Sequence, residues 1–272
     1  MTDRVRFRPF TGDSERRVSM IKPPLELVLV QIRWPEHAGR LLRDFDSLAL
    51  DFGDQLKDFP LFNEITEQGI QITPEGMSPI QGSKAYQWRS VDDIWTVHLT
   101  KLFVSVFCVK HENYSYSSLE GHLVDVTRLM EEVLGIRTIE RVGVRYVNRI
   151  SDPELLGSLT QVFDPAVLGF EQLATRSDVS LESNVTQGRY SVEDVLIQAR
   201  SGILPPSETL DPAIPPLGKR SWVLDLDASH DKRTQYDPLE TLCMVGRLAD
   251  AAYDFFKLVL REDGPDKLDG AK

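Results

Sequence analysis

The chain has 272 residues, with 31 Lys and Arg against 42 Asp and Glu, so its formal net charge is −11. Its 41% apolar and 27% charged residues are typical of a globular protein and exclude disordered and collagen-like classes. An acidic surface repels phosphate backbones, which disfavours nucleic acid as a partner. Residues 1–24 carry basic side chains and no long apolar run, so we expect no signal peptide, no membrane association and a cytoplasmic location.

The first half of the chain alternates between strand and helix patterns. Residues 25–34 form an apolar, β-branched run that predicts a strand, and residues 35–59 carry apolar side chains at helical spacing. Residues 115–134 form the clearest helix, and Gly135 follows it where helices commonly end. Between these helices, an antiparallel meander of strands is predicted over residues 69–73, 85–91, 94–99 and 102–109.

The second half repeats this order of elements. It begins with a predicted strand over residues 141–150 and a partly helical segment from Pro153, and it closes with a helix over residues 236–260. The segment 203–220 contains five prolines, which predicts a long exposed loop. Three strands are predicted between the helical segments, over residues 177–185, 189–199 and 221–229.

Two successive units of strand, helix, antiparallel meander and helix predict an α+β protein, pseudo-duplicated, with its sheets backed by helices. The expected division has four parts: a flexible N-terminal arm over residues 1–22, a first α+β unit over 23–137, a second over 138–262, and a disordered tail over 263–272.

Two motifs point to a known family. Pro23-Pro24-Leu25-Glu26 opens the first strand as PPxE, and the strand over residues 141–150 reads RVGVRYVNRI, an RxGxRYxNRI pattern. Together with Leu224-Asp225-Leu226-Asp227 and the closing helix, these motifs resemble a sporadically distributed family of uncharacterised bacterial proteins. The resemblance implies an accessory role, for example in a defence- or toxin-linked assembly.

The most suggestive polar residues lie on two predicted strands. Period-2 alternation puts Arg145 and Arg149 on one face of the first strand, and Asp225 and Asp227 on one face of the second. If the strands are neighbours, these arginines pair with these aspartates as a structural ion network. Alternatively, the four residues line a groove and bind a ligand. We expect Arg145 to be structural and Arg149 to bind.

These observations favour a non-enzymatic binding or interaction protein, an accessory component or a ligand sensor. Its partner would be a protein or a small anionic ligand, no cofactor is expected, and a homo-oligomer is compatible with the sequence. Two alternatives stay open. Asp225 and Asp227 could serve a metal-dependent hydrolase or phosphodiesterase, or the net charge of −11 could belong to an acidic scaffold that mimics nucleic acid.

Overall fold

A computed structural model describes the chain from residue 6 to residue 270, except residues 14, 16–17, 36–38, 67–68, 74–75, 81–83, 110–113, 174–177 and 212–213. For residues 69–73, 76–80 and 171–172 it describes only the backbone. Within these described parts, no helix combines the length and the apolarity needed to cross a membrane.

One antiparallel sheet of nine strands forms the centre of the molecule. Two further pairs of strands, β13 (Thr234–Gln235) with β8 (Thr138–Ile139) and β3 (Gly69–Thr73) with β4 (Gly76–Ile80), form separate small sheets. From one edge to the other, the strands of the large sheet are β10 (Thr186–Val192), β11 (Val195–Leu204), β12 (Ser221–His230), β9 (Arg141–Ile150), β1 (Leu25–Arg33), β7 (Phe103–Val109), β6 (Trp95–Leu99), β5 (Lys84–Arg89) and β2 (Leu61–Thr66).

The strand order repeats between the two halves of the chain. In each half the last strand of the meander pairs with the first strand of that half, β7 with β1 and β12 with β9. The two first strands, β1 and β9, pair with each other at the centre of the sheet. The predicted α+β class and its repeated order of elements are therefore confirmed, and strands of both predicted units share one sheet.

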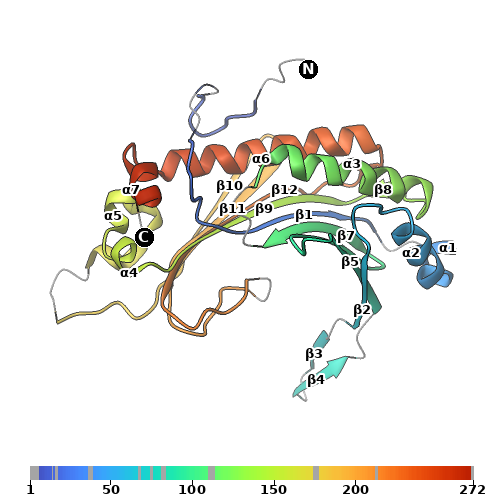
Figure 1. Cartoon of the computed structure of the whole chain (residues 1–272), viewed down its shortest axis with the longest axis horizontal. Helices are drawn as coiled ribbons and strands as arrows, with labels where there is room; N and C mark the ends of the chain where they lie inside the picture. The colour runs from blue at the N-terminus through green and yellow to red at the C-terminus, as the bar shows by residue number, and fades with distance from the viewer. Residues whose placement is uncertain are drawn as a thin grey trace.

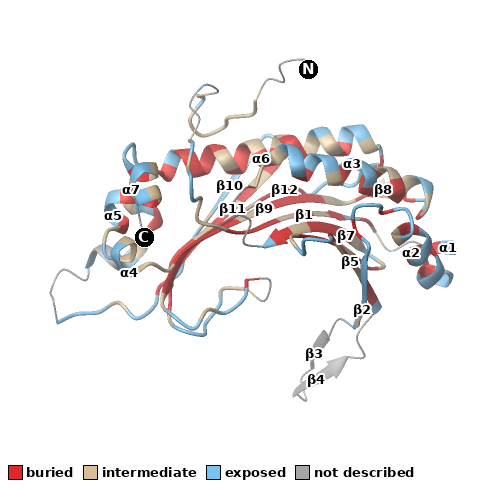
Figure 2. Cartoon of the chain, viewed as in Figure 1, coloured by how far each residue is buried: buried red, intermediate tan, exposed pale blue. Residues whose placement is uncertain are grey.

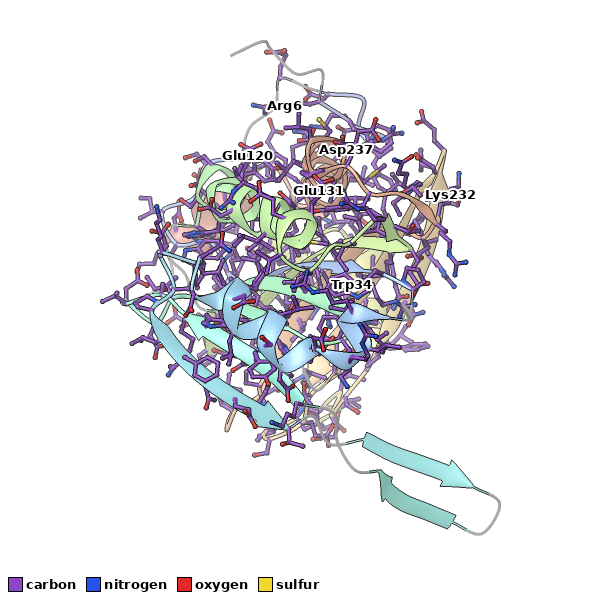
Figure 3. All side chains as sticks on the ribbon, turned by 90° about the vertical axis from the view of Figure 1, so that its right-hand side faces the viewer. Arg6, Trp34, Glu120, Glu131, Lys232 and Asp237 are labelled. Atoms are coloured by element: carbon purple, nitrogen blue, oxygen red, sulfur yellow. The ribbon has the colours of Figure 1, made fainter. Side chains whose placement is uncertain are left out.

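Helices cover one face of this sheet. Helix α6 (Pro238–Val259) contacts β9, β11 and β12, and α3 (Tyr116–Glu132) lies beside it over β7 (Figure 1). In Figure 3, the labelled Glu120 and Glu131 of α3 and Asp237 before α6 mark this helix layer. The side of each helix that faces the sheet is buried, as Figure 2 shows. Strand and helix side chains thus form one continuous apolar core between the two layers.

Shorter helices close the ends of this layer. Helix α2 (Phe45–Gly53) follows α1 (Arg40–Arg43) and packs Phe45 against Tyr86 of β5, with ring centroids 5.7 Å apart. At the other end lie α4 (Pro153–Leu156), α5 (Leu159–Val162) and α7 (Gly264–Gly270), as Figure 1 shows. Helix η1 (Pro165–Val167) contacts β11 and η2 (Gly169–Leu173).

Several element boundaries differ from those expected. The single helix predicted over residues 35–59 is divided into α1 and α2 at Asp44, and residues 36–38 lie outside the described residues. The strand predicted over 177–185 is wrong, because residues 178–185 form no strand and residue 177 is not described. The strand predicted over 189–199 spans the β10–β11 turn, where Glu193 has a φ of 55°. Strands β2 and β4 were not expected.

The N-terminal segment expected to be a flexible arm is docked on α6 where it is described. The fully buried Asp254 accepts hydrogen bonds from the backbone N–H groups of Phe10 and Thr11, at 2.8 and 3.0 Å. The fully buried Lys257 donates to the carbonyl of Asp13 at 2.6 Å. These two charges explain the docking, because a buried charge needs partners and the backbone of the arm supplies them.

The C-terminal segment also differs from its prediction. Residues 263–272 were expected to be a disordered tail, but Gly264–Gly270 forms α7 and residues 271–272 lie outside the described part. Leu268 of this helix is buried in the main core, and α7 packs on α5. One apolar residue in a charged segment is a weak sequence signal, which accounts for the wrong prediction.

Candidate functional site on the face opposite the helices

The four predicted site residues lie on the sheet face that the helices leave uncovered. Strands β9 and β12 are direct neighbours, as the network required, with Asp227 opposite Arg145 and Val223 opposite Arg149. Because side chains alternate along a strand, these residues share one face while Val144 and Leu224 point into the main core. The structure therefore brings the predicted site residues together on one surface, but in two different environments.

Arg145 forms an ion pair with Asp225 of β12. Its Nε and Nη2 donate to the two oxygens of Asp225 at 2.8 and 2.9 Å, a bidentate pair. Arg200 of β11 binds the same Asp225 from the other side, with its Nη2 2.6 Å from Oδ2. The side chain of Asp225 is only 1% exposed. The predicted ion pair between Arg145 and an aspartate of β12 is thus confirmed, and Asp225 is shared between two arginines.

Asp227 pairs with Arg141 rather than with Arg149, so the expected pairing of Arg149 with an aspartate of β12 is wrong. The Nη2 of Arg141 donates to both oxygens of Asp227, at 3.0 and 3.1 Å. Gly143 makes room for this reach, since a Cβ at that position would lie 2.3 Å from the Arg141 guanidinium. The glycine of the RxGxR string therefore lets the Arg141 side chain lie over position 143 and reach Asp227, which stands opposite Arg145.

Arg149 lacks a comparable partner. Its Nη1 donates to the carbonyl of Pro215 at 2.7 Å and lies 3.5 Å from an oxygen of Glu26. Only 2% of its side chain is exposed, and its Nε and Nη2 are buried without a hydrogen-bond partner among the described residues. Buried guanidinium nitrogens are normally bonded, so two of them without a partner indicate a site that is incomplete.

The segment between β11 and β12 covers this face rather than extending into solvent (Figure 1). The exposed loop expected over residues 203–220 is therefore corrected in part. Ile203 and Leu204 belong to β11 and the middle of the segment is docked, whereas residues 206–209, 215–216 and 218–219 are exposed as expected. The Oδ2 of Asp211 lies 3.3 Å from the Nη2 of Arg145 and 3.2 Å from the Nη2 of Arg200. Ile214 is fully buried, and residues 212–213 are not described.

Ile214 belongs to a small apolar cluster that is separate from the main core. It packs with Leu27, Val147, Leu204 and Val223, which are also buried. Leu29, Phe107 and Leu210 border this cluster and are partly exposed. The cluster lies on the sheet face of Arg145 and Arg149, because Val147 stands between them on β9.

The two arginines differ in their electrostatics. Burial disfavours the charge of Arg145, but the hydrogen bonds and charges of Asp225 and Asp211 outweigh this effect, so the pKa of Arg145 is raised. At Arg149 burial dominates and the charge of Glu26 opposes only part of it, so the pKa of Arg149 is lowered. The charge of Arg149 is consequently the less compensated of the two.

Sequence reasoning did not identify Arg200 and Asp211 as members of this site. Arg200 lies on β11, one residue beyond the predicted end of that strand, and Asp211 lies in a segment for which the sequence predicts an exposed loop. The signal for Arg200 was the period-2 spacing of Gln198, Arg200 and Gly202, which continues past the predicted end. No local pattern marked Asp211, because its contacts depend on tertiary docking.

Two shallow depressions lie elsewhere on the molecule. They have volumes of about 390 and 400 Å³, and both are lined by residues of α1 and α2, including Arg40 and Leu48. Neither is lined by residues of the arginine–aspartate network. Their walls carry both positive and negative charges, such as Arg43 beside Asp46, which gives them no single ligand preference.

The geometry disfavours Asp225 as a metal ligand. Both of its oxygens accept hydrogen bonds from guanidinium groups, which already neutralise the carboxylate. Both oxygens of Asp227 likewise accept hydrogen bonds from the guanidinium of Arg141, which neutralises this carboxylate as well. In the described part of the chain, no three His, Cys, Asp or Glu side chains are grouped to hold a metal ion. The nucleic-acid-mimic alternative stays a prediction.

The resemblance to a family of bacterial proteins stays a prediction as well. A comparison of the sequence with protein-family models and with curated proteins finds no match, so the function must be argued from the site itself.

Proposed function

We propose that this chain is a non-enzymatic, cytoplasmic binding protein that captures an anionic group of a ligand or protein partner at Arg149, beneath the segment 205–220. Its role would be that of an accessory component of a larger assembly, as in the sporadically distributed bacterial family that its PPxE and RxGxRYxNRI motifs resemble. Arg145, Asp225 and Asp227 would then build the surface on which the ligand rests.

The two unpartnered nitrogens of Arg149 carry this proposal. The three arginines of the arginine–aspartate network, Arg141, Arg145 and Arg200, each bind carboxylates of the chain itself. Arg149 is more deeply buried than these three but keeps Nε and Nη2 without a partner among the described residues. A carboxylate or phosphate would supply acceptors for both, in the fork geometry that a guanidinium favours.

The experiment follows the arginine Nε–H signals of the full chain by NMR. Propionate and inorganic phosphate are titrated into the native protein and into the Asp211→Asn variant, which loosens the covering segment. The Arg149 signal is assigned by its loss in Arg149→Lys. We expect it to shift saturably with at least one anion. The signals of Arg145 and Arg200, whose Nε atoms already bind Asp225, should stay in place as internal controls.

An Arg149 signal that moves with neither anion, in either protein, contradicts the proposal. A shift that is equal for all the arginines of the face also contradicts it, because it would report a general ionic-strength effect rather than a site.

A further inference from the structure

The segment between β11 and β12 binds to the sheet face opposite the helices. Asp211 inserts its carboxylate between Arg145 and Arg200, Ile214 fills the small apolar cluster, and the Pro215 carbonyl accepts from Arg149. The segment thus places a carboxylate at Arg145 and Arg200, an aliphatic side chain in the apolar cluster, and a carbonyl oxygen at Arg149. These are contacts of the kind that a bound peptide makes.

The conformation of this segment is set locally. The N–H of Ile214 donates to the carbonyl of Asp211 at 2.9 Å. The hydroxyl of Thr209 lies 2.8 Å from the carbonyl of Asp211 and 2.6 Å from that of Ile214. Thr209, Asp211 and Ile214 are therefore hydrogen-bonded to one another, and a short peptide of residues 209–215 contains all three.

The segment is an incomplete occupant at the Arg149 end. A peptide carbonyl offers one oxygen, and the Pro215 carbonyl bonds only Nη1. A carboxylate at the same place offers a second oxygen and a full negative charge, which would engage the unpartnered Nε or Nη2 and offset the buried charge. A chain that ended at the position of Pro215 would present such a carboxylate as its C-terminus.

We infer that this face binds the free C-terminal end of a partner polypeptide, in place of its own segment. The partner's terminal carboxylate lies at Arg149, an aliphatic residue just before the terminus fills the cluster of Val147 and Val223, and an acidic residue four positions before the terminus binds Arg145 and Arg200. The inference rests on the proposed function and names its ligand, while the chain's own segment acts as an intramolecular competitor.

The test measures fluorescence anisotropy of a labelled heptapeptide with the sequence of residues 209–215, Thr-Leu-Asp-Pro-Ala-Ile-Pro, ending in a free carboxylate. Matched peptides end in a carboxamide or carry Asn in place of Asp. The protein is the full chain, native or with Asp211→Asn. We expect the free acid to bind the variant on the order of tenfold more tightly than the carboxamide does. The native chain, whose own segment competes, should bind more weakly than the variant.

Variants at two arginines supply the matched controls. Arg149→Lys, placed in the Asp211→Asn background, should remove the preference for the free acid while keeping a positive charge. Arg141→Lys in the same background should keep that preference, because Arg141 binds Asp227 and Asp231 and none of the described residues of the segment. Circular dichroism confirms that each variant is folded before its binding is compared.

Three outcomes overturn the inference. Equal binding of acid and carboxamide would mean that an internal loop, such as that of a second copy, suits the face as well as a terminus does. Displacement of the heptapeptide by glutarate at equal concentration would indicate a small dicarboxylate site. Absence of heptapeptide binding, with the Arg149 Nε–H signal still shifted by propionate, overturns the peptide inference alone. An unresponsive Arg149 signal overturns the proposed function itself.

Discussion

The two faces of the large sheet are stabilised in different ways. The face under α3 and α6 is a continuous apolar core, and its side chains are buried by neighbours that are themselves apolar. The opposite face carries a small apolar cluster between charged groups, and its burial depends on one segment of chain. The first face gains its stability mainly from buried apolar area, whereas the second depends on charged and polar partners that must be matched one by one.

The largest expected effect lies on the helix-covered face. Leu129 of α3 is fully buried there, so Leu129→Ala should lower the free energy of unfolding by about 2–5 kcal/mol through lost burial and a residual cavity. Val124 of the same helix is 48% exposed, and Val124→Ala should change little. Urea unfolding of both variants measures the difference. A cost below about 0.5 kcal/mol at Leu129 would remove the contrast between the faces.

On the opposite face, two arginines of one strand should respond differently. Arg145→Met leaves the buried Asp225 with a single cation, and we expect a loss of about 3 kcal/mol. Arg149→Met removes a charge whose desolvation is poorly compensated, and we expect a loss below about 1 kcal/mol. The comparison uses the same urea titration. The reverse order of the two losses would exchange the structural and binding roles.

The N-terminal segment docked on α6 shows whether matched polar partners also contribute to stability away from the sheet face opposite the helices. Deletion of residues 1–13 removes the backbone groups that pair with the buried Asp254 and Lys257, so it should cost about 2 kcal/mol and lower the melting temperature. Glu262→Ala, at an exposed position after α6, is the control and should not alter the melting temperature. An unchanged melting temperature after the deletion would show that the segment is a loose arm.

The smallest effect concerns the covering segment. Asp211→Asn weakens two ion pairs at partly exposed positions, so it should cost about 1 kcal/mol or less. Local opening should nevertheless increase, because these contacts hold the segment on the sheet. Hydrogen exchange should become faster at Ile214 and stay unchanged at Leu129. Equal exchange at Ile214 in the two proteins would mean that the apolar cluster alone holds the segment.

The sequence predicts the elements whose periodicity is strong. Strand β9 has the predicted bounds, and α3 and α6 lie within a few residues of theirs. The errors occur where local patterns are ambiguous. A tight turn divides the run over residues 189–199 at Glu193 and Asp194, where two adjacent acidic residues break the alternation of polar and apolar side chains. Docking of the N-terminal segment depends on charges in α6, more than two hundred residues away.

The candidate site was predictable to the same extent. Alternation correctly put Arg145 and Asp225 on one face, but it could not say which aspartate each arginine would reach. That choice depends on strand register, and here Asp227 stands opposite Arg145 while Asp225 lies on the diagonal. The incomplete environment of Arg149 depends on a proline-rich segment folding back over the sheet, which no local pattern in that segment specifies.

The pairing of β1 with β9 has a consequence for how the molecule can vary. Two identical half-length chains that joined through their first strands would present every side chain twice, and a change on one half would be repeated on the other. Here one chain supplies both halves, so each can carry different residues. Beside β9 the uncovered face bears Asp225 and Asp227 on β12, whereas beside β1 it bears Phe103 and Phe107 on β7. A fused chain can therefore pair a charged half with an apolar half, an asymmetry that a twofold dimer cannot attain.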